Sequence, residues 1–489
     1  CWNINININI NININIRLFK CIIIIMLINI GRRKILIPNQ RITKENIITI
    51  MKGVLATHTL NFEEEDYLYW YRRGKQPILD KEKLVREDIN NKVVENHAAE
   101  IVSFKNGYFL AQAANYRPRK GKESVKNKVL ELNEYLYLSG KHDADNELVD
   151  WFHTVGVACL YVEPDEDTFV SAVALDPRYS AVAYFNNPKK SKALGFHIAQ
   201  IGENIAYEVF TEEYKFTIQG GSADATYGGM FDIADDATVS VEKNRIGLIP
   251  MVEYRYNNAD MGAFESVVGM LDAINNVQSN RVDAIQQFVN SLLVFYNCTL
   301  GTDEKGNPIT PEYIREVGAV FLKSVGENKA DLKELSSQLN QTDQQVLANN
   351  MYEQVLRICG MPSTTKGGTS TSDTGAAVLL RDGWQNADAC ARNTEDLFKK
   401  SNKEFDKIFL KILANTRQFT INTEDYELHF PRTETMNLLS KAEGAVLLKQ
   451  LGLSPELVLA KSGISNDPVT DVATSEPYIS RAFEVGANE

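Results

Sequence analysis

The sequence of 489 residues predicts an α+β protein built from several domains. Three features support this fold class. Residues 157–254 contain short, β-prone apolar runs separated by turns. Residues 264–290 and 376–417 are nearly free of glycine and proline and have the composition of long helices. Residues 361–375 consist almost entirely of Ser, Thr and Gly, which is typical of a flexible loop.

The composition is that of an ordinary globular protein, with 44% hydrophobic and 24% charged residues. The formal net charge of −12 excludes strong binding of nucleic acid by bulk electrostatics, which requires clustered Lys and Arg. If the protein handles DNA, the DNA should slide past it. The six cysteines contain no C-x-x-C spacing, so we expect free thiols in a reducing compartment.

Residues 1–35 are predicted to be a low-complexity, apolar leader. Residues 3–16 are Asn-Ile pairs, and the apolar run 21–30 is too short to span a bilayer. Residues 31–34 back-translate as a purine-rich ribosome-binding sequence. We therefore expect upstream translation here, a mature chain that begins near Leu36, and no membrane anchor.

The first domain is predicted from alternating helical and β-prone patterns that end near Tyr254. A turn is expected at Asn106-Gly107, before a strand. The predicted helices are 38–73, a short one from Asn96, 125–139 and 146–156. The predicted strands are 157–162, 169–175, 181–185, 193–201, 206–211, 214–218 and 238–242.

The pattern changes to long helices after residue 255. The helix 264–290 would be on the order of 40 Å long. A β-like run at 292–300, a turn at 303–308, a short helix from Pro311 and a strand at 318–323 follow it. Next come a helix at 342–359, the Ser/Thr/Gly loop and the helix 376–417, roughly 60 Å long. A strand at 426–430, helices at 436–451 and 454–462, and a polar tail complete the chain.

No catalytic signature is present. The sequence lacks a phosphate-binding loop, a dinucleotide fingerprint, a zinc-protease motif and a nucleophile elbow. The acidic clusters 142–145 and 163–167 are expected to be solvated turns and not metal sites. We therefore expect no enzyme activity, no metal and no cofactor. Because an isolated chain could hardly bury every face of such long helices, a ring of subunits packed head to tail is expected.

Four segments carry a resemblance to a known family. They are residues 96–102 with 106–108, residues 249–254 with 261–265, residues 271–275 with 278–280, and residues 372–377. In order and spacing they resemble the portal proteins of tailed bacteriophages, of the type found in siphophages of Gram-positive hosts. The similarity covers residues 36–465.

The resemblance implies a multi-domain portal fold of wing, stem, clip and crown that assembles into a ring of about twelve subunits around a channel. The implied wing is 36–255, with a long wing helix and strand at 376–433. The stem helices are 256–292 and 339–361, the clip is 293–338, the channel loop is 362–375, and the crown with its polar tail is 434–489.

The implied function is passage of DNA through one capsid vertex during packaging and ejection. The expected partners are other copies of the chain, double-stranded DNA without sequence specificity, the terminase large subunit, head-completion or adaptor proteins, and the major capsid and scaffold proteins. The expected location is the virion, after assembly in the host cytoplasm.

Candidate residues follow from these roles. Lys366 could contact phosphates transiently, although a loop that acts only by bulk and mobility is the favoured alternative. The loop residues expected near DNA are Ser363, Thr364, Lys366, Thr369, Ser370 and Thr371. The candidate lumen acids are Glu265, Asp272 and Asp283, and the candidate partner surface of the clip is Asp303, Glu304 and Lys305.

Two other functions remain open at this point. A different phage structural protein, such as a capsid or baseplate component, would form an assembly other than a closed channel. A DNA-processing enzyme would need an acidic metal cluster or a phosphate loop, and neither is found in the sequence.

Overall fold

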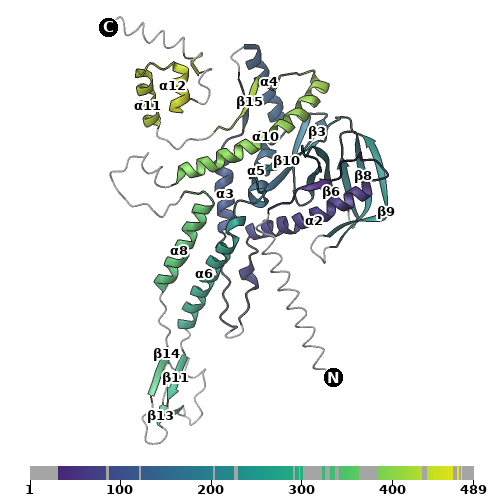
Figure 1. Cartoon of the computed structure of the whole chain (residues 1–489). Coiled ribbons are helices and arrows are strands. Elements are labelled where there is room, and N and C mark those ends of the chain that lie inside the picture. The colour runs from purple at the N-terminus through teal and green to yellow at the C-terminus, as the bar shows by residue number, and fades with distance from the viewer. Residues whose placement is uncertain are drawn as a thin grey trace, which may run out of the picture. The chain divides into compact units, whose positions relative to one another are not determined.

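The computed structural model divides the chain into two compact units (Figure 1). The first unit comprises segments 1–75, 96–268 and 355–489, and the second comprises segments 76–95 and 269–354. The structure describes residues 31–83, 87–119, 123–201, 204–224, 230–289, 292–296, 298–300, 322–324, 331–335, 341–362, 383–431, 438–465, 471, 472 and 475.

The first unit combines helices with antiparallel sheets. Its helices are α2 (Ile47–Arg72), α3 (His97–Phe109), α4 (Glu123–Leu138), α5 (Lys141–Val155), α10 (Trp384–Arg417), α11 (Leu438–Gln450), α12 (Pro455–Ser462) and the 3-10 turn η3 (Glu265–Val267). Its strands are β1 (Ile35–Ile37), β2 (Asn115–Pro118), β3 (Val157–Asp165), β4 (Phe169–Leu175), β5 (Ser180–Phe185), β6 (Lys192–Ile201), β7 (Asn204–Phe210), β8 (Tyr214–Asp224), β9 (Met230–Lys243), β10 (Met251–Arg255) and β15 (Tyr426–His429).

Three sheets occur among the described residues of the first unit. The largest has the order β1-β5-β6-β7-β8-β9, in which only the β1–β5 pair is parallel. Helix α2 covers it, and residues such as Met51 pack with Phe196 and Tyr207 in one buried cluster. The sheet β10-β3-β4 packs against α10, whose Phe398 and Phe405 are fully buried. The third sheet pairs β15 with β2.

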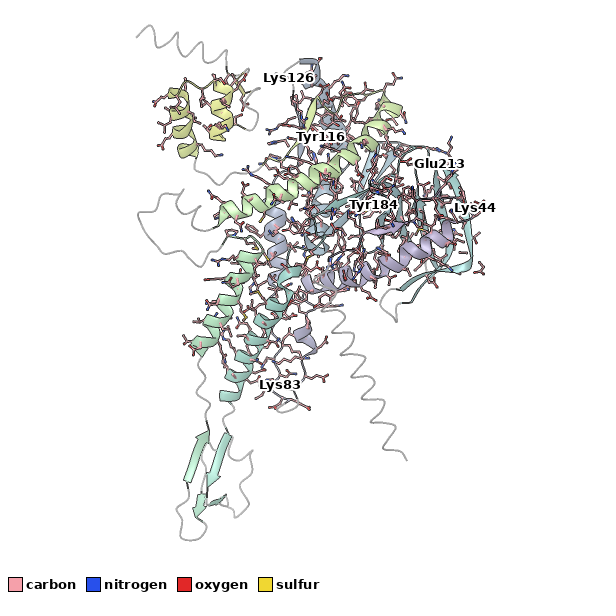
Figure 2. The ribbon with its side chains drawn as sticks, viewed as in Figure 1. Lys44, Lys83, Tyr116, Lys126, Tyr184 and Glu213 are labelled. Carbon is pink, nitrogen blue, oxygen red and sulfur yellow. The ribbon has the colours of Figure 1, made fainter. Side chains whose placement is uncertain are left out.

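Figure 2 shows Tyr184 in the interior of the first unit and Glu213 and Lys44 at its edge.

The second unit contains most of the helices α6 (Val268–Val289) and α8 (Gln341–Ile358) and the 3-10 turn η1 (Pro77–Asp80). Strand β11 (Leu292–Tyr296) pairs antiparallel with β14 (Asp331–Leu335), and β12 (Cys298–Leu300) pairs antiparallel with β13 (Leu322–Ser324). Except for Leu292, the first residue of β11, all four strands fall in the segment 293–338 that the sequence resemblance assigns to the clip.

Most predicted elements are confirmed within one to five residues, and β4 has the predicted bounds. The turn predicted at Asn106-Gly107 is wrong, because helix α3 continues to Phe109. Inside α3, the Asn106 amide donates to Asp150 at 2.7 Å and its oxygen lies 2.7 Å from Nδ1 of His153. These contacts hold Asn106 in the helix against its turn propensity.

Helix α10 begins later than predicted. Gly383, which was placed inside one helix running from 376, has a φ of +84° and caps α10 at its N-terminus. Side chains other than Gly rarely adopt this backbone conformation, so Gly383 interrupts the helical pattern. Residues 376–382 lie outside the described residues.

The predicted boundary at Leu36 divides a folded segment and is wrong as a domain limit. Ile35 and Ile37 are buried on either side of Leu36, and β1 pairs with β5 from Ile35 onward. Arg32 is also buried in the first unit. The repeat at 3–16 and the apolar run 21–30 lie outside the described residues.

The two acidic clusters differ in structure. Residues 142–145 form the first turn of α5, where Asp145 forms a buried ion pair with Lys141, so a solvated turn was the wrong prediction there. In the second cluster, Asp165 accepts hydrogen bonds from Thr168 in the turn between β3 and β4. Over the described part of the chain, no helix has the length and apolar character needed to cross a membrane.

Candidate functional site

Helix α6 carries a buried polar stripe on one side. Asn275, Ser279 and Asp283 follow one another at intervals of four residues, so they share one helix face. Their exposed fractions are 0%, 0% and 4%. Buried polar groups require hydrogen-bond partners, and here the segment 76–95 supplies them. We call this segment the strap.

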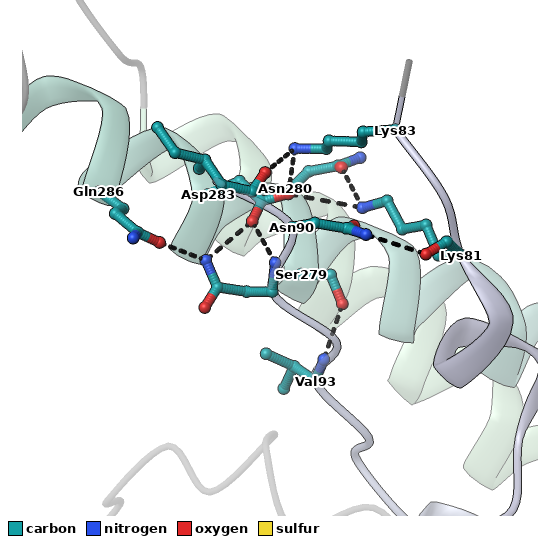
Figure 3. Close-up of polar contacts among 10 residues, drawn as sticks. Lys81, Lys83, Asn90, Val93, Ser279, Asn280, Asp283 and Gln286 are labelled. Atoms are coloured by element: carbon teal, nitrogen blue, oxygen red, sulfur yellow. Dashed lines mark hydrogen bonds and ion pairs between the residues drawn. The ribbon is translucent and has the colours of Figure 1, made fainter. Parts of the chain in front are cut away.

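The stripe binds the backbone of the strap at every second residue. Figure 3 shows the part of this interface around Ser279 and Asp283. The Asn275 side-chain oxygen accepts from the Glu95 N–H at 2.8 Å. The Ser279 hydroxyl accepts from the Val93 N–H at 2.9 Å. The Asp283 carboxylate accepts from the Asn91 N–H at 2.7 Å.

The register has a simple geometric origin. Four helical residues rise about 6 Å, and two extended residues rise about 6.6 Å. A stripe spaced by four on a helix therefore matches alternate N–H groups of an extended chain. The amide of Asn275 also contacts the side-chain oxygen of Gln76, so both ends of the strap are fixed on the same residue.

Asp283 holds the middle part of the strap. Its carboxylate forms ion pairs with Lys83 and, at 3.6 Å, with Lys81, and it also accepts from the Asn91 amide at 2.8 Å. Burial acts to raise the pKa of Asp283, but the hydrogen bonds from Lys83 and Asn91 outweigh it and lower that pKa. The carboxylate is therefore charged at neutral pH and serves as an internal anchor. Because these contacts occupy its carboxylate, Asp283 is not an unpaired acid in the isolated subunit.

Glu265 is also buried inside the first unit, with 1% of the residue exposed. One carboxylate oxygen lies 2.7 Å from the Arg32 guanidinium, and the other accepts from the Gly262 N–H at 2.7 Å. Burial raises the pKa of Glu265 to about 7, although Arg32 acts in the opposite direction. The prediction that Glu265 faces a channel is not compatible with this position in the isolated chain.

Arg32 is shared between two carboxylates. Besides Glu265, it contacts Glu64 of α2 at 3.1 Å, and Glu64 in turn lies 2.8 Å from Arg33. Burial raises the pKa of Glu64, and both arginines oppose that shift. The cluster fastens the segment before β1 to α2 and to the turn that precedes α6.

Asp272 is the remaining candidate acid. It is half-buried on α6, and its backbone oxygen accepts from the Asn276 amide at 3.0 Å. The predicted loop residues Ser363, Thr364, Lys366, Thr369, Ser370 and Thr371 lie outside the described residues, as do Asp303, Glu304 and Lys305 of the clip.

The helices of the second unit leave large apolar side chains in solvent. Val282 and Ile285 on α6 are 40% and 53% exposed, and Val346 and Leu347 on α8 are 52% and 51% exposed. Apolar residues on amphipathic helices normally face a partner surface, so these positions mark faces that one chain alone does not cover. No cluster of three or more His, Cys, Asp or Glu that could hold a metal ion occurs among the residues that the structure describes.

The sequence analysis missed the strap and the role of Arg32. The strap shows neither helical nor strand periodicity, but the stripe of polar residues at intervals of four on an otherwise amphipathic helix was a visible signal. Arg32 and Glu265 are separated by 233 positions, and nothing local in the sequence pairs them.

Comparison with known proteins identifies the family. No curated protein sequence matches the chain at a significant level. The family profile described as "Phage portal protein, SPP1 Gp6-like" matches residues 54–475, which include most of both structural units. Because this match covers far more than half of the sequence, the chain belongs to the SPP1-like family of phage portal proteins, which are virion components with a part in genome packaging.

Proposed function

We propose that the protein is the ring-forming channel subunit at one vertex of the capsid of a tailed phage, of the siphophage type with a Gram-positive host. The observation that carries the proposal is the set of exposed apolar residues on α6 and α8, within a chain of the portal family. In a head-to-tail ring, these residues would pack against the neighbouring subunit.

Separate parts of the chain would serve the steps of the viral cycle. The clip, with Asp303, Glu304 and Lys305, would first bind terminase and later the head-completion proteins. The loop 362–375 would lie near DNA, and the net charge of −12 would limit adhesion of the duplex. The chain itself would carry out no catalysis, because terminase would hydrolyse ATP.

The direct test is negative-stain electron microscopy with mass measurement by light scattering. The protein should retain residues 31–35, because Arg32 and Ile35 are part of the folded first unit. We expect a closed ring of about twelve subunits with a central channel. A filament or a compact dimer would contradict the proposal and favour another structural role.

The role of Lys366 has its own test in the assembled phage. Lys366→Ala should change the length of packaged DNA if this lysine contacts phosphates, because its charge is repeated around the ring. Thr369→Ala is the matched control in the same loop. Unchanged packaging and retention in both variants would leave the loop with a role of bulk and mobility only.

A further inference from the structure

Two cysteines lie at the base of the proposed channel loop. Cys359 ends the last turn of α8, where its N–H donates to the Val355 oxygen at 2.9 Å, and Cys390 lies in the second turn of α10. Both belong to the first unit. Residues 363–375, the loop that was predicted to lie near DNA, fall between them in the sequence.

The structure brings the end of α8 against the start of α10. Gly360, the neighbour of Cys359, has a φ of +65°, and a methyl group placed on it would lie 2.7 Å from Sγ of Cys390. A methyl group on Gly383 would lie 3.8 Å from Cα of Pro362. The sulfur of Cys390 therefore packs on the backbone one residue away from Cys359, and the chain returns close to the place where it leaves α8.

Both thiols share their surroundings with a buried lysine. Lys105 of α3, Gly360 and Cys390 line one small cavity of about 20 Å³, together with Tyr256 and His153. Burial lowers the pKa of Lys105, and the two thiols act in the opposite direction. Burial raises the pKa of the Cys359 thiol to about 11, Lys105 counteracts this rise, and Cys390 adds to it. Each group is thus near enough to influence the others.

We propose that Cys359 and Cys390 are a redox-active pair that forms a disulfide across the base of the loop when the protein leaves a reducing compartment. The two residues differ in accessibility, since Cys359 is 6% exposed and Cys390 is half-buried. The inference depends on the proposed function only for the place of the loop in a channel.

The oxidant would be a low-molecular-weight disulfide. The more accessible Cys390 thiolate would attack one sulfur of that disulfide, form a mixed disulfide and release one thiolate. The Cys359 thiolate, after its proton leaves to solvent, would then attack Sγ of Cys390, form the intramolecular S–S bond and release the second thiolate. The two protein thiols lose two electrons and two protons, and the small disulfide becomes two small thiols.

The compartment that surrounds the protein would determine when the disulfide forms. Thiols stay reduced in a bacterial cytoplasm, where the particle would assemble, and disulfides persist outside it. The loop ends would then be free to move during packaging and be fixed to each other in the released particle.

The test uses the full chain, reduced and then incubated with oxidised glutathione, followed by alkylation and peptide mapping by mass spectrometry. We expect most molecules to contain a peptide linked through Cys359 and Cys390. In Cys359→Ser, glutathione should remain attached to Cys390. In the parent protein, Cys159 is the internal control, because it is buried in β3 and has a pKa raised to about 12 by burial, so it should stay free.

Two results would overturn the inference. One is glutathione that stays on Cys390 of the parent protein. The other is a pair that remains unmodified in the folded protein but reacts after denaturation. The outcome is separable from that of the proposed function: a ring without the linked peptide refutes only the thiol pair, whereas a linked peptide without a ring refutes only the channel role.

Discussion

Replacing Arg32 by Met should test whether the buried ion cluster before β1 stabilises the first unit. The change removes the contacts at 2.7 Å to Glu265 and 3.1 Å to Glu64 while keeping the aliphatic length of the side chain. Glu64 retains Arg33, but Glu265 is left with one backbone N–H. Removing one partner of a buried pair costs about 3–5 kcal/mol because an uncompensated charge remains. We expect a loss of this size at pH 8.

The loss should be smaller at pH 5. The pKa of Glu265 is about 7 with Arg32 present, so the carboxyl is mostly protonated at pH 5 and leaves no buried charge behind. The assay is urea unfolding at both pH values, followed by tryptophan fluorescence, because all four tryptophans of the chain belong to the first unit.

Arg41→Met provides a matched control. The Arg41–Glu213 pair has the same 2.7 Å separation, but its side chains are 71% and 56% exposed. Exposed ion pairs contribute little to stability, so this variant should unfold at the same urea concentration as the parent protein. If both variants lost the same unfolding free energy, this would refute the argument that burial of an ion pair determines how much its removal destabilises the protein.

Three further predictions concern the same two units. Glu265→Gln should reduce the dependence of folding stability on pH. The Glu265 carboxyl, whose pKa rises from 4.5 unfolded to about 7 folded, stabilises the fold fully below pH 4.5, and about 3 kcal/mol of this stabilisation is lost as the pH rises to 7. In urea titrations, a slope between pH 5 and 7 as steep as that of the parent protein would contradict this. In Asp283→Ala, limited proteolysis should cleave the strap many-fold faster than in Asn276→Ala, an exposed position on α6 that serves as the control, because Asp283→Ala loses four contacts to the strap. Equal cleavage rates in the two variants would refute the role of Asp283 as an anchor. A chain beginning at Leu36 should melt several degrees below one beginning at Gly31, as measured by calorimetry, because it lacks Arg32 and the buried Ile35; equal melting temperatures would contradict that reasoning.

The sequence predicted those elements whose pattern is local. Strand β4 and helix α8 follow directly from β-branched runs and helical spacing, and their ends agree with the structure to within one residue. The order and spacing of four short segments were enough for the resemblance to phage portal proteins, and the profile match confirms that family.

Two of the errors share one physical cause, which is a long-range contact that overrides a local preference. Asn106 stays helical because Asp150 and His153 bind its side chain. Ile35 looked like the end of a leader, but its pairing partner Ala183 lies far along the chain. Neither partner could be chosen from composition or periodicity.

The acids on and before α6 illustrate a limit of reasoning from charge alone. A carboxylate can repel DNA from a channel wall only if it remains solvated and unpaired. In the structure, two of the three candidate acids are instead engaged in contacts within the chain. Glu265 neutralises Arg32, and Asp283 neutralises Lys83 and binds the backbone of Asn91. Removal of Glu265 would leave the buried Arg32 with Glu64 alone, and removal of Asp283 would take from the Asn91 N–H the carboxylate to which it donates. An acidic lumen would therefore have to be built from acids other than Glu265 and Asp283.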